Sequence, residues 1–233
     1  MAVTTLSIDI GGSGIKGMVL DPEAQPLNER VRIETPERAD PEAVFEIIDR
    51  LVAQQPRFDR VSVGFPGVVQ SGVTRNAPNL DGDWRDVPLA ARVAEMTGRP
   101  CRAINDADMQ GYGAIEGKGV EMVITLGTGM GSAIFTNGHL VPNLELGHHP
   151  FRKGKTYEER LCDAERREMG NKKWSRRVLR AVEQILPIWN PRVLYLGGGN
   201  TKKLAVDLPP RVRPVENIVG ILGGLRIWDD EEP

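Results

Sequence analysis

Cysteine is scarce in this sequence, and the two that occur, Cys101 and Cys162, lie far apart and form no CxxC pair. This excludes a disulfide framework and gives no support to a cysteine-rich zinc site. Long apolar runs are also missing, because no stretch approaches the roughly 18 residues that a membrane span requires. The N-terminus has neither the basic nor the apolar segment of a secretion signal. We therefore expect a cytoplasmic protein with no membrane partner.

An excess of charge of either sign is absent as well. Lysine and arginine together number 30 and aspartate and glutamate 32, for a net charge of −2. Electrostatics therefore gives no reason to expect binding to nucleic acid. Hydrophobic residues make up 40% and charged residues 27% of the 233 residues, which is typical of an ordinary globular protein with one large domain or two small ones.

The most informative stretch runs from Ile8 to Leu20. Residues 6–10 alternate as a short buried strand does, the glycines then permit a tight turn, and residues 17–20 are typical of the returning strand. Backbone N–H groups and a lysine in such a turn can hold a phosphate, while the aspartate is left for the water shell of a Mg²⁺ ion. The alternative is an ordinary hairpin with a flexible tip. The candidate phosphate-binding residues are Asp9, Gly11, Gly12, Ser13, Gly14 and Lys16, and Asp9 is also the candidate metal residue.

The elements after this hairpin predict a mixed sheet with helices on its faces. Asp40 before Pro41 is a helix N-cap followed by proline at the first helical position. Gly98 and Pro100 end a later helix. The first half is expected to contain strands at 31–35, 60–65 and 101–104, and helices that start near 40, 87 and 105, the last of which reaches 117.

The pattern then restarts in the second half, where Asn137 and Gly138 predict a type I′ hairpin. The expected elements are strands at 121–126, 132–136, 139–141 and 192–196, a basic helical stretch over 157–186, and a tail helix over 216–228. Each half opens with a strand, a glycine-rich turn and a strand. We therefore predict an α/β protein of two lobes, with the two turns on either side of one cleft.

The second glycine-rich turn follows the strand at 121–126. Thr128 and Ser132 add hydroxyl groups to it, so backbone N–H groups of both turns could hold phosphate. Alternatively, its glycines merely allow a tight hairpin. The candidate phosphate-binding residues of this turn are Gly127, Thr128, Gly129 and Gly131.

Asn105 and Asp106 follow a predicted strand, at the end where α/β sheets gather their ligands. Phosphoryl transfer to a hydroxyl group needs a carboxylate that accepts its proton, and an amide beside it can orient the acceptor. Asp106 and Asn105 fit these two roles. Both residue types are also common helix N-caps, and the two roles can coexist.

Glu145 and His148 stand three residues apart, with Gly147 between them. A carboxylate and an imidazole together suit the recognition of sugar hydroxyl groups, while their spacing is not that of the HExxH zinc motif. The alternative is an exposed loop histidine without a role. Two turn sequences contribute Gly67 and Asn79, and the Asn79 amide could serve a hydroxyl group.

Basic residues are concentrated in the second half of the chain. Such a run is usually a solvated helix face, but it could instead follow a polyanion. The residues are Arg166, Arg167, Lys172, Lys173, Arg176, Arg177 and Arg180, with Lys202 and Lys203 further on.

Taken in this order, the motifs resemble the ROK family of sugar kinases, within the actin-like ATPase superfamily with its ribonuclease H-like fold. The turns at Asp9–Lys16 and Leu126–Gly131 are similar to the family's two phosphate motifs. Asn105-Asp106 resembles its catalytic pair and residues 145–148 its ExGH sugar motif. The turn Gly197-Gly198-Gly199-Asn200 is similar to its adenosine-side turn, which adds Gly198, Gly199 and Asn200 as candidate donor residues. Most members carry a cysteine-rich zinc loop after ExGH, whereas only Cys162 occurs here, so structural zinc is not expected.

The short chain and the sequence that leads into the ExGH motif resemble most the polyphosphate glucokinase branch of the family. This resemblance implies transfer of a phosphoryl group from polyphosphate or ATP, with Mg²⁺, to the 6-hydroxyl of glucose. It implies that Asp106 is the general base, and it leaves open whether Glu158 or Glu159 is a further sugar residue. It also implies a homodimer with lobes over about 1–107 and 108–215, the terminal helix at 216–233 packing on the first lobe. The implied sugar-binding residues are Asn79, Asn105, Glu145, His148, Glu158 and Gly67.

The sequence leaves the donor and the sugar open. ATP would need an adenine pocket near 197–200, and polyphosphate a basic track along 172–180. The sugar could be another hexose or an N-acetylhexosamine. A non-catalytic sugar sensor is a further alternative, since ROK relatives include repressors, although these carry an N-terminal helix-turn-helix and here the phosphate turn begins within the first ten residues.

Overall fold

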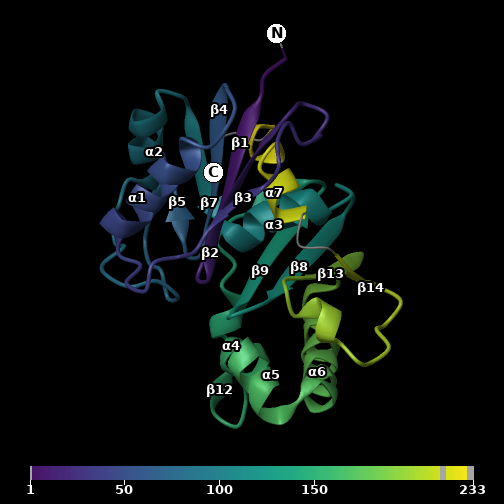
Figure 1. Cartoon of the computed structure of the whole chain (residues 1–233). Coiled ribbons are helices and arrows are strands. Elements are labelled where there is room, and N and C mark those ends of the chain that lie inside the picture. The colour runs from purple at the N-terminus through teal and green to yellow at the C-terminus, as the bar shows by residue number, and fades with distance from the viewer. Residues whose placement is uncertain (1, 216–218, 230–233) are drawn as a thin grey trace. The chain divides into compact units, whose positions relative to one another are not determined.

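The computed structural model describes residues 2–215 and 219–229, and these form two compact units (Figure 1). Unit 1 extends to Gly113 and resumes at Gly220. Unit 2 spans Ala114–Val219. No helix of the residues described is long and apolar enough to cross a membrane.

Unit 1 is built on a five-stranded mixed sheet in the order β3-β2-β1-β4-β7. The first three strands along the chain are antiparallel neighbours, whereas β1, β4 and β7 run parallel. Apolar side chains such as Leu6, Ile8 and Val63 are fully buried in it. The strands are β1 (Thr5–Gly11), β2 (Gly14–Leu20), β3 (Val31–Ile33), β4 (Arg60–Phe65) and β7 (Cys101–Asn105), with a separate small hairpin of β5 (Val69–Gln70) and β6 (Val73–Thr74).

The helices of unit 1 begin and end at the residues that the capping rules select. In α1 (Pro41–Val52) the Asp40 side chain accepts a hydrogen bond from the Ala43 N–H at 3.1 Å, as predicted. The helix α2 (Leu89–Thr97) ends at Gly98, whose φ of 63° lies in the left-handed region. The helix predicted to reach 117 is shorter, because α3 (Asp106–Ala114) ends three residues earlier.

The predicted tail helix over 216–228 is wrong in its described part, and its residues 216–218 lie outside the described residues. The chain instead forms α7 (Val219–Gly223) and the 3₁₀ turn η3 (Arg226–Trp228). Between them, Gly224 approaches β1 and β4 so closely that a Cβ atom would overlap the Ser7 hydroxyl, and its carbonyl accepts a hydrogen bond from the Ser62 hydroxyl at 2.5 Å. This close approach interrupts the helix and holds the segment on the unit 1 sheet.

Unit 2 is built on a second five-stranded mixed sheet in the order β10-β9-β8-β13-β14. Asn137 and Gly138 have positive φ values of 52° and 89°, as the predicted hairpin turn requires. The strands are β8 (Val120–Leu126), β9 (Met130–Thr136), β10 (His139–Val141), β13 (Val193–Gly197) and β14 (Val212–Pro214), with a separate hairpin of β11 (Pro150–Arg152) and β12 (Lys155–Thr156).

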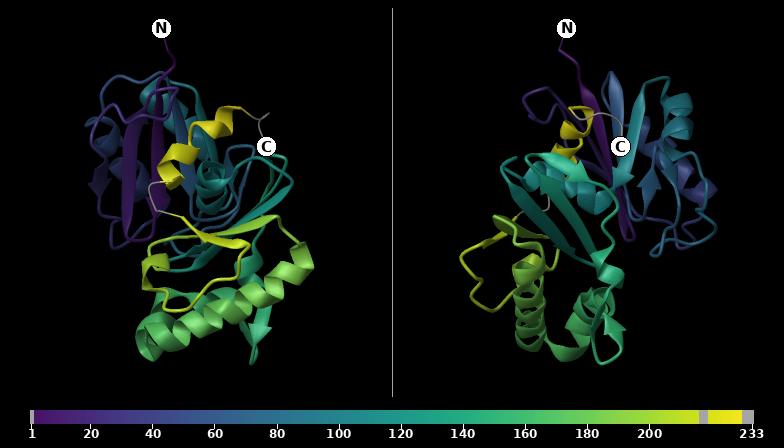
Figure 2. Two further views of the ribbon diagram at one scale, coloured as in Figure 1. Left: turned by 90° about the vertical axis from the view of Figure 1, so that its right-hand side faces the viewer. Right: turned by 180° about the vertical axis from the view of Figure 1, so that it is seen from behind.

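The single helical stretch predicted over 157–186 is wrong, because the chain forms three helices there. They are α4 (Tyr157–Leu161), α5 (Asp163–Met169) and α6 (Asn171–Trp189). Cys162 has an extended backbone, and Gly170 has a φ of 80°, so neither residue can continue a helix. The long helix α6 (Figure 2) buries Trp174, Val178 and Ile185 in the core that it shares with the unit 2 sheet. Two 3₁₀ turns, η1 (Leu146–His148) and η2 (Thr201–Lys203), complete the unit.

Candidate active site

The carboxyl ends of β1, β4 and β7 share one edge of the unit 1 sheet. Asp9 lies opposite Gly64 in β4, and Phe65 of β4 lies opposite Asn105 in β7. Because parallel strands place their carboxyl ends together, Asp9 and the Asn105–Asp106 pair stand at the same edge. The structure thus gathers the predicted base and the predicted metal residue at the kind of edge where α/β sheets bind ligands.

Asn105 caps α3 and also fixes the neighbouring turn. Its side-chain oxygen accepts hydrogen bonds from the N–H groups of Ala107 at 2.7 Å and Asp108 at 3.2 Å. Its side-chain nitrogen donates to the Gly67 carbonyl at 3.1 Å. The buried amide is therefore a helix cap, and among the described residues Gly67 is the acceptor for its side-chain nitrogen. Asp106, the next residue, is half-buried and accepts a hydrogen bond from the Ala107 N–H at 2.8 Å.

The first glycine-rich turn carries more charge than the sequence suggested. Lys16 lies directly opposite Asp9 across the β1–β2 hairpin and donates a hydrogen bond to its Oδ2 atom at 2.9 Å. The two side chains are 29% and 26% exposed. Arg32 of neighbouring β3 donates to the Ser13 carbonyl at 2.7 Å and packs against Gly14. Sequence reasoning missed Arg32, whose place at the turn depends on the pairing of β2 with β3.

Two loops that the sequence singled out lie close to this edge. Asn79 is exposed, and its carbonyl lies 3.6 Å from where a Cβ atom of Gly12 would stand. At Gly67 a Cβ atom would overlap the backbone of Asn76, so this position requires glycine for its close approach. The structure therefore brings Asn79 to the first turn and gives Gly67 a structural reason, with its carbonyl holding Asn105.

In unit 2 the second glycine-rich turn packs against the turn at 197–200. The Asn200 N–H donates to the Leu126 carbonyl at 3.0 Å, and its side chain donates to the Gly127 carbonyl at 3.1 Å. Gly198, with a φ of 88°, lies so close to Leu126 that a Cβ atom would overlap its backbone. Thr128 and Gly199 are exposed beside these contacts. The two sets of candidate donor residues of unit 2 are thus neighbours.

The hydroxyl group of Ser132 does not serve this turn, contrary to the sequence-based expectation. It is buried, donates to the Leu144 carbonyl at 2.5 Å and accepts a hydrogen bond from the Leu146 N–H at 3.1 Å. Ser132 therefore anchors the loop that leads into the Glu145–His148 motif. Thr125, near the end of β8, contributes a hydroxyl group to this turn, because it accepts a hydrogen bond from the Gly131 N–H at 3.1 Å.

The Glu145–His148 motif gathers a third polar residue, Glu158. His148 lies between two carboxylates, with Nδ1 at 4.0 Å from Glu145 Oε2 and Nε2 at 3.5 Å from Glu158 Oε2. Gly147 makes the approach possible, because a Cβ atom there would stand 2.5 Å from the Met130 carbonyl oxygen. Burial raises the pKa of the Glu145 carboxyl, the nearby His148 ring opposes this rise, and the Glu158 charge adds to it.

Glu159 is engaged elsewhere. Its carboxylate accepts a hydrogen bond from the Thr156 N–H at 2.8 Å, and the Thr156 hydroxyl accepts one from the Glu159 N–H at 3.2 Å. This is a capping box at the start of α4. Of the two adjacent glutamates, only Glu158 is within 4 Å of His148 in the described structure.

Asp9 is the candidate residue for a Mg²⁺ ion, and it stands outside any cluster of metal-binding side chains in the described residues. Among residues 2–215 and 219–229, no group of three or more His, Cys, Asp or Glu side chains is suited to a metal ion. A Mg²⁺ ion that accompanies a phosphate donor needs only one or two protein carboxylates, since water and phosphate oxygens complete its shell. Asp9 fits this requirement: Lys16 occupies its Oδ2 atom, and no described residue donates to Oδ1.

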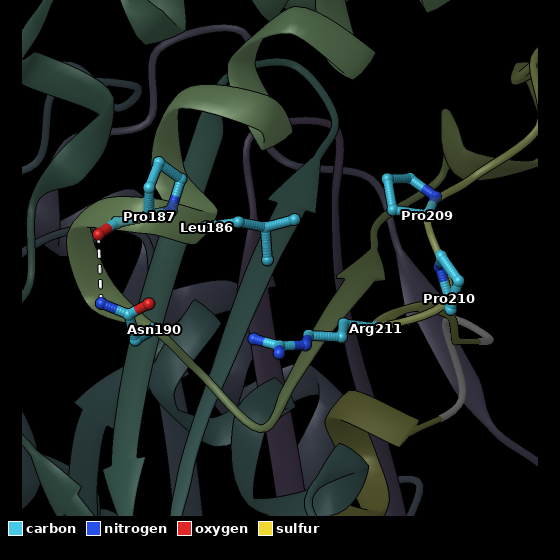
Figure 3. Close-up of a pocket in the computed structure, with 6 residues that line it drawn as sticks. All are labelled: Leu186, Pro187, Asn190, Pro209, Pro210 and Arg211. Carbon is cyan, nitrogen blue, oxygen red and sulfur yellow. Dashed lines mark hydrogen bonds between the residues drawn. The ribbon is translucent and has the colours of Figure 1, made fainter.

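A hollow of about 410 Å³ lies elsewhere in unit 2 (Figure 3). It stands between the carboxyl-terminal end of α6 and the segment before β14, and none of the predicted site residues lines it. Its walls are mainly apolar, apart from Arg211 and from Asn190, whose amide donates to the Pro187 carbonyl at 3.1 Å. The lining residues are Leu186, Pro187, Asn190, Pro209, Pro210 and Arg211.

Known proteins resemble this chain over most of its length. The matching family is described as the ROK family and covers residues 5–164. Polyphosphate glucokinase of Mycobacterium tuberculosis (strain ATCC 25618 / H37Rv) is 36% identical over 93% of this chain and 88% of its own length. An N-acetylmannosamine kinase of Escherichia coli (strain SE11) is 34% identical over 63% of this chain and 53% of its own length.

Solved structures of sugar kinases are also similar to this chain. Inorganic polyphosphate/ATP-glucomannokinase from Arthrobacter sp. strain KM superposes with a TM-score of 0.88 at 34% identity, over 96% of this chain and 97% of its own. A ROK family glucokinase from Streptomyces griseus, in complex with glucose and AMPPNP, superposes with a TM-score of 0.78 at 19% identity, over 96% and 98%, which shows the fold alone. The predicted actin-like ATPase fold, with mixed sheets flanked by helices, is thereby confirmed. This chain belongs to the ROK family.

Proposed function

We propose that this protein is a glucokinase that transfers a phosphoryl group from polyphosphate or ATP to the 6-hydroxyl of glucose. The observation that carries the proposal is the likeness, over nearly the whole chain, to polyphosphate glucokinases and to a polyphosphate/ATP-glucomannokinase. The geometry of both units supports it, because each predicted chemical role has a residue in a suitable place.

Asp106 is the general base of this proposal. It stands at the carboxyl edge of the unit 1 sheet, where its carboxylate accepts the proton of the attacking hydroxyl group. Asn105 holds the start of α3 and the Gly67 turn in one network, so it positions Asp106, and its amide orients the sugar. Asn79, next to the first turn, is the further sugar residue of unit 1.

Glu145, His148 and Glu158 hold the other sugar hydroxyl groups. Two carboxylate acceptors on either side of an imidazole match a ligand whose neighbouring hydroxyl groups both donate and accept. Glu158 is preferred to Glu159 because Glu159 is committed to the capping box. These residues supply orientation, which can contribute a large part of the rate of such a reaction.

The two glycine-rich turns hold the donor phosphates through backbone N–H groups. Lys16 and Arg32 give the first turn positive charge, and the turn at 197–200 lies beside the second. Mg²⁺, which Asp9 would hold through water, neutralises charge on the transferred phosphate when bound. The protein itself supplies mainly positioning and electrostatic stabilisation.

The lobes of this kinase are proposed to cover about residues 1–107, with the terminal segment, and 108–215. A homodimer acting in the cytoplasm is likewise part of the proposal, as the resemblance to the family implies. No zinc is assigned a role.

Mannose is the second candidate sugar, because the relative from Arthrobacter is named a glucomannokinase. The proposed sugar residues can donate to and accept from the hydroxyl groups of either hexose, so the sugar must be identified by assay. Purified protein with Mg²⁺ should be offered ATP or long-chain polyphosphate together with glucose, mannose, fructose, N-acetylglucosamine or N-acetylmannosamine. We expect sugar 6-phosphate from glucose with at least one donor. Turnover of an N-acetylhexosamine alone would overturn the glucokinase assignment.

A further inference from the structure

The basic residues of 160–180 and 202–203 fall into two groups that differ in their partners. In α4 and α5 the arginines are neutralised: Asp163 pairs with Arg166 at 2.7 Å and with Arg167 at 2.6 Å. Glu165 pairs with Arg160 at 3.4 Å and with Arg177, which comes from α6. These ion pairs tie the three helices together, so this group has a structural role.

The second group is exposed and forms no ion pair with any described residue. It consists of four residues of α6 and two of η2, namely Lys172, Lys173, Arg176, Arg180, Lys202 and Lys203. Positions 172, 176 and 180 repeat every four residues, so they lie in one row on the outer face of α6, opposite the buried Trp174 and Val178. The row is about 12 Å long at 1.5 Å per residue, and Glu183 follows it.

These cations connect to the donor side of unit 2. Asn200, which binds the Gly127 carbonyl, directly precedes η2 with its two lysines. After η2 the Ala205 N–H donates to the Ser175 hydroxyl at 2.9 Å, which places this segment beside the first turns of α6 (Figure 2). Lys172 is one turn away from Ser175. The segment that carries Lys202 and Lys203 therefore adjoins both the second glycine-rich turn and the start of α6.

We propose that these six exposed cations bind the chain of polyphosphate that extends beyond the phosphate being transferred. They are Lys202 and Lys203 of η2, the row of Lys172, Arg176 and Arg180 on α6, and the adjacent Lys173. The inference rests on the proposed function and names the substrate of its donor site. A long polyanion gains from each fixed cation it meets through the release of its counterions, and short donors such as ATP or tripolyphosphate meet fewer cations. The net charge of −2 favours this local row over a general affinity for nucleic acid.

The test compares three donors in three proteins. The variant Lys172→Gln/Arg176→Gln/Arg180→Gln removes the row and keeps good helix formers. The control Arg30→Gln/Arg50→Gln/Arg57→Gln removes the same charge from exposed positions of unit 1. Initial rates are measured with long-chain polyphosphate, tripolyphosphate and ATP at several salt concentrations. Direct binding of long-chain polyphosphate is measured separately, without glucose.

We expect the row variant to show a KM for long-chain polyphosphate that is raised roughly tenfold, given three lost exposed charge contacts. Its binding of polyphosphate should weaken equally and depend less steeply on salt. Rates with ATP and tripolyphosphate should stay within about twofold of the wild type, as should all values for the control.

Unchanged use and binding of polyphosphate by the row variant would overturn the inference, and so would an equal loss with ATP. Wild-type protein that uses ATP alone and does not bind polyphosphate would also overturn it, while leaving the kinase proposal intact. If neither donor gives a sugar phosphate, the proposed function fails, and the binding measurement still decides the inference. Tighter binding of RNA than of polyphosphate of equal charge would reassign the row to nucleic acid.

Discussion

The sheets of unit 1 and unit 2 order their strands in the same way: two antiparallel pairings on one side of the first strand and two parallel pairings on the other. The registers also agree. Asp9 lies opposite Gly64 in unit 1, and Thr125 lies opposite Gly197 in unit 2. One backbone plan therefore recurs, and the chemistry of each unit comes from what occupies matching positions.

The matching positions differ in charge. At the end of the first strand, unit 1 has the carboxylate of Asp9 paired with Lys16, whereas unit 2 has Thr125, whose hydroxyl bonds the Gly131 backbone. The last strand of the unit 1 sheet, β7, ends at Asn105 and leads directly into Asp106 and α3, whereas in unit 2 β14 ends at Pro214. The base and the metal residue proposed here thus belong to unit 1 alone.

The insertions differ as well. In unit 1 the third strand is followed by α1, whereas in unit 2 η1, β11, β12, α4 and α5 come before α6. The triplet of Glu145, His148 and Glu158 lies in this inserted region. The repeated plan thus positions the two turns proposed to hold the donor, whereas the sugar residues proposed for unit 2 lie in a segment that unit 1 lacks.

The largest effect is expected from removal of the carboxylate that follows β7, because β14 in unit 2 has no counterpart to it. Asp106→Asn should lower kcat about a thousandfold, because a positioned general base contributes about 10² to 10⁴. Glucose affinity, measured by calorimetry, should change little, since Asn105 still holds the turn. Near-normal turnover in this variant would show that another group takes the proton.

The second comparison concerns the residue four positions before Asp9 and Thr125. In unit 2 this is Glu121, fully buried, which accepts from the Gly117 and Lys118 N–H groups at 2.7 and 2.9 Å and from Arg192 at 2.7 Å. Glu121→Gln should lower the free energy of unfolding by about 3 kcal/mol, because it leaves buried donors without a charged acceptor. Urea denaturation measures this.

The matched position in unit 1 is Thr5, whose hydroxyl accepts a hydrogen bond from Arg60 at 2.8 Å. Thr5→Val should cost only about 1 kcal/mol, since one neutral acceptor is lost. Equal losses for the two variants would contradict the view that unit 2 depends on its buried carboxylate.

Glu121 also predicts a dependence of stability on pH. Burial alone would raise the pKa of its carboxyl, but hydrogen bonds from the 116–118 backbone and from Tyr195 outweigh burial and lower it. A carboxyl with a lowered folded pKa adds stability above its unfolded pKa, and this stability is lost as pH falls through the folded value. The acid loss of stability should therefore be smaller in Glu121→Gln than in the wild type.

A smaller effect, on sugar affinity, is expected from two adjacent glutamates of the inserted region, Glu158 and Glu159. Glu158→Gln should raise the KM for glucose about tenfold, because a charged acceptor of a hydroxyl group is lost. Glu159→Gln, the matched control, should leave that KM within about twofold, since Glu159 caps α4. A larger effect of Glu159→Gln would reverse the assignment.

The smallest effect is expected from the pH dependence of sugar binding. Because burial raises the pKa of Glu145, its carboxylate takes up a proton at a higher pH than an ordinary glutamate. The KM for glucose should therefore rise a few-fold on the acid side, beginning above the usual range of a glutamate. In Glu145→Gln this rise should be absent, and a profile that matches the wild type would contradict the role of Glu145.

Local signals predicted much of this structure. The Asp40 cap, the Asn137-Gly138 hairpin and the buried strand at residues 6–10 each depend on neighbours within a few residues, and all were confirmed. The two-lobed fold followed from the recurrence of these signals. The three-residue strand β14 was missed, because so short a strand has no pattern that distinguishes it from a loop.

What the sequence did not show depends on pairing across the sheets. Ser132 binds the loop near Leu144, and Arg32 reaches Ser13, only because distant segments are neighbours in the fold. The sequence also holds a signal that distinguishes Glu159 from Glu158. Thr156 followed three residues later by Glu159 is the sequence signature of a capping box, which commits Glu159 and leaves Glu158 as the candidate sugar residue.

The central claim is tested most directly by ³¹P NMR of the protein incubated with glucose, Mg²⁺ and either polyphosphate or ATP. We predict a new phosphomonoester signal coupled to the two protons on C6 of glucose, formed by the wild type and about a thousandfold more slowly by Asp106→Asn. Folded protein that gives no such signal with either donor, or a signal coupled to another carbon position, would contradict it.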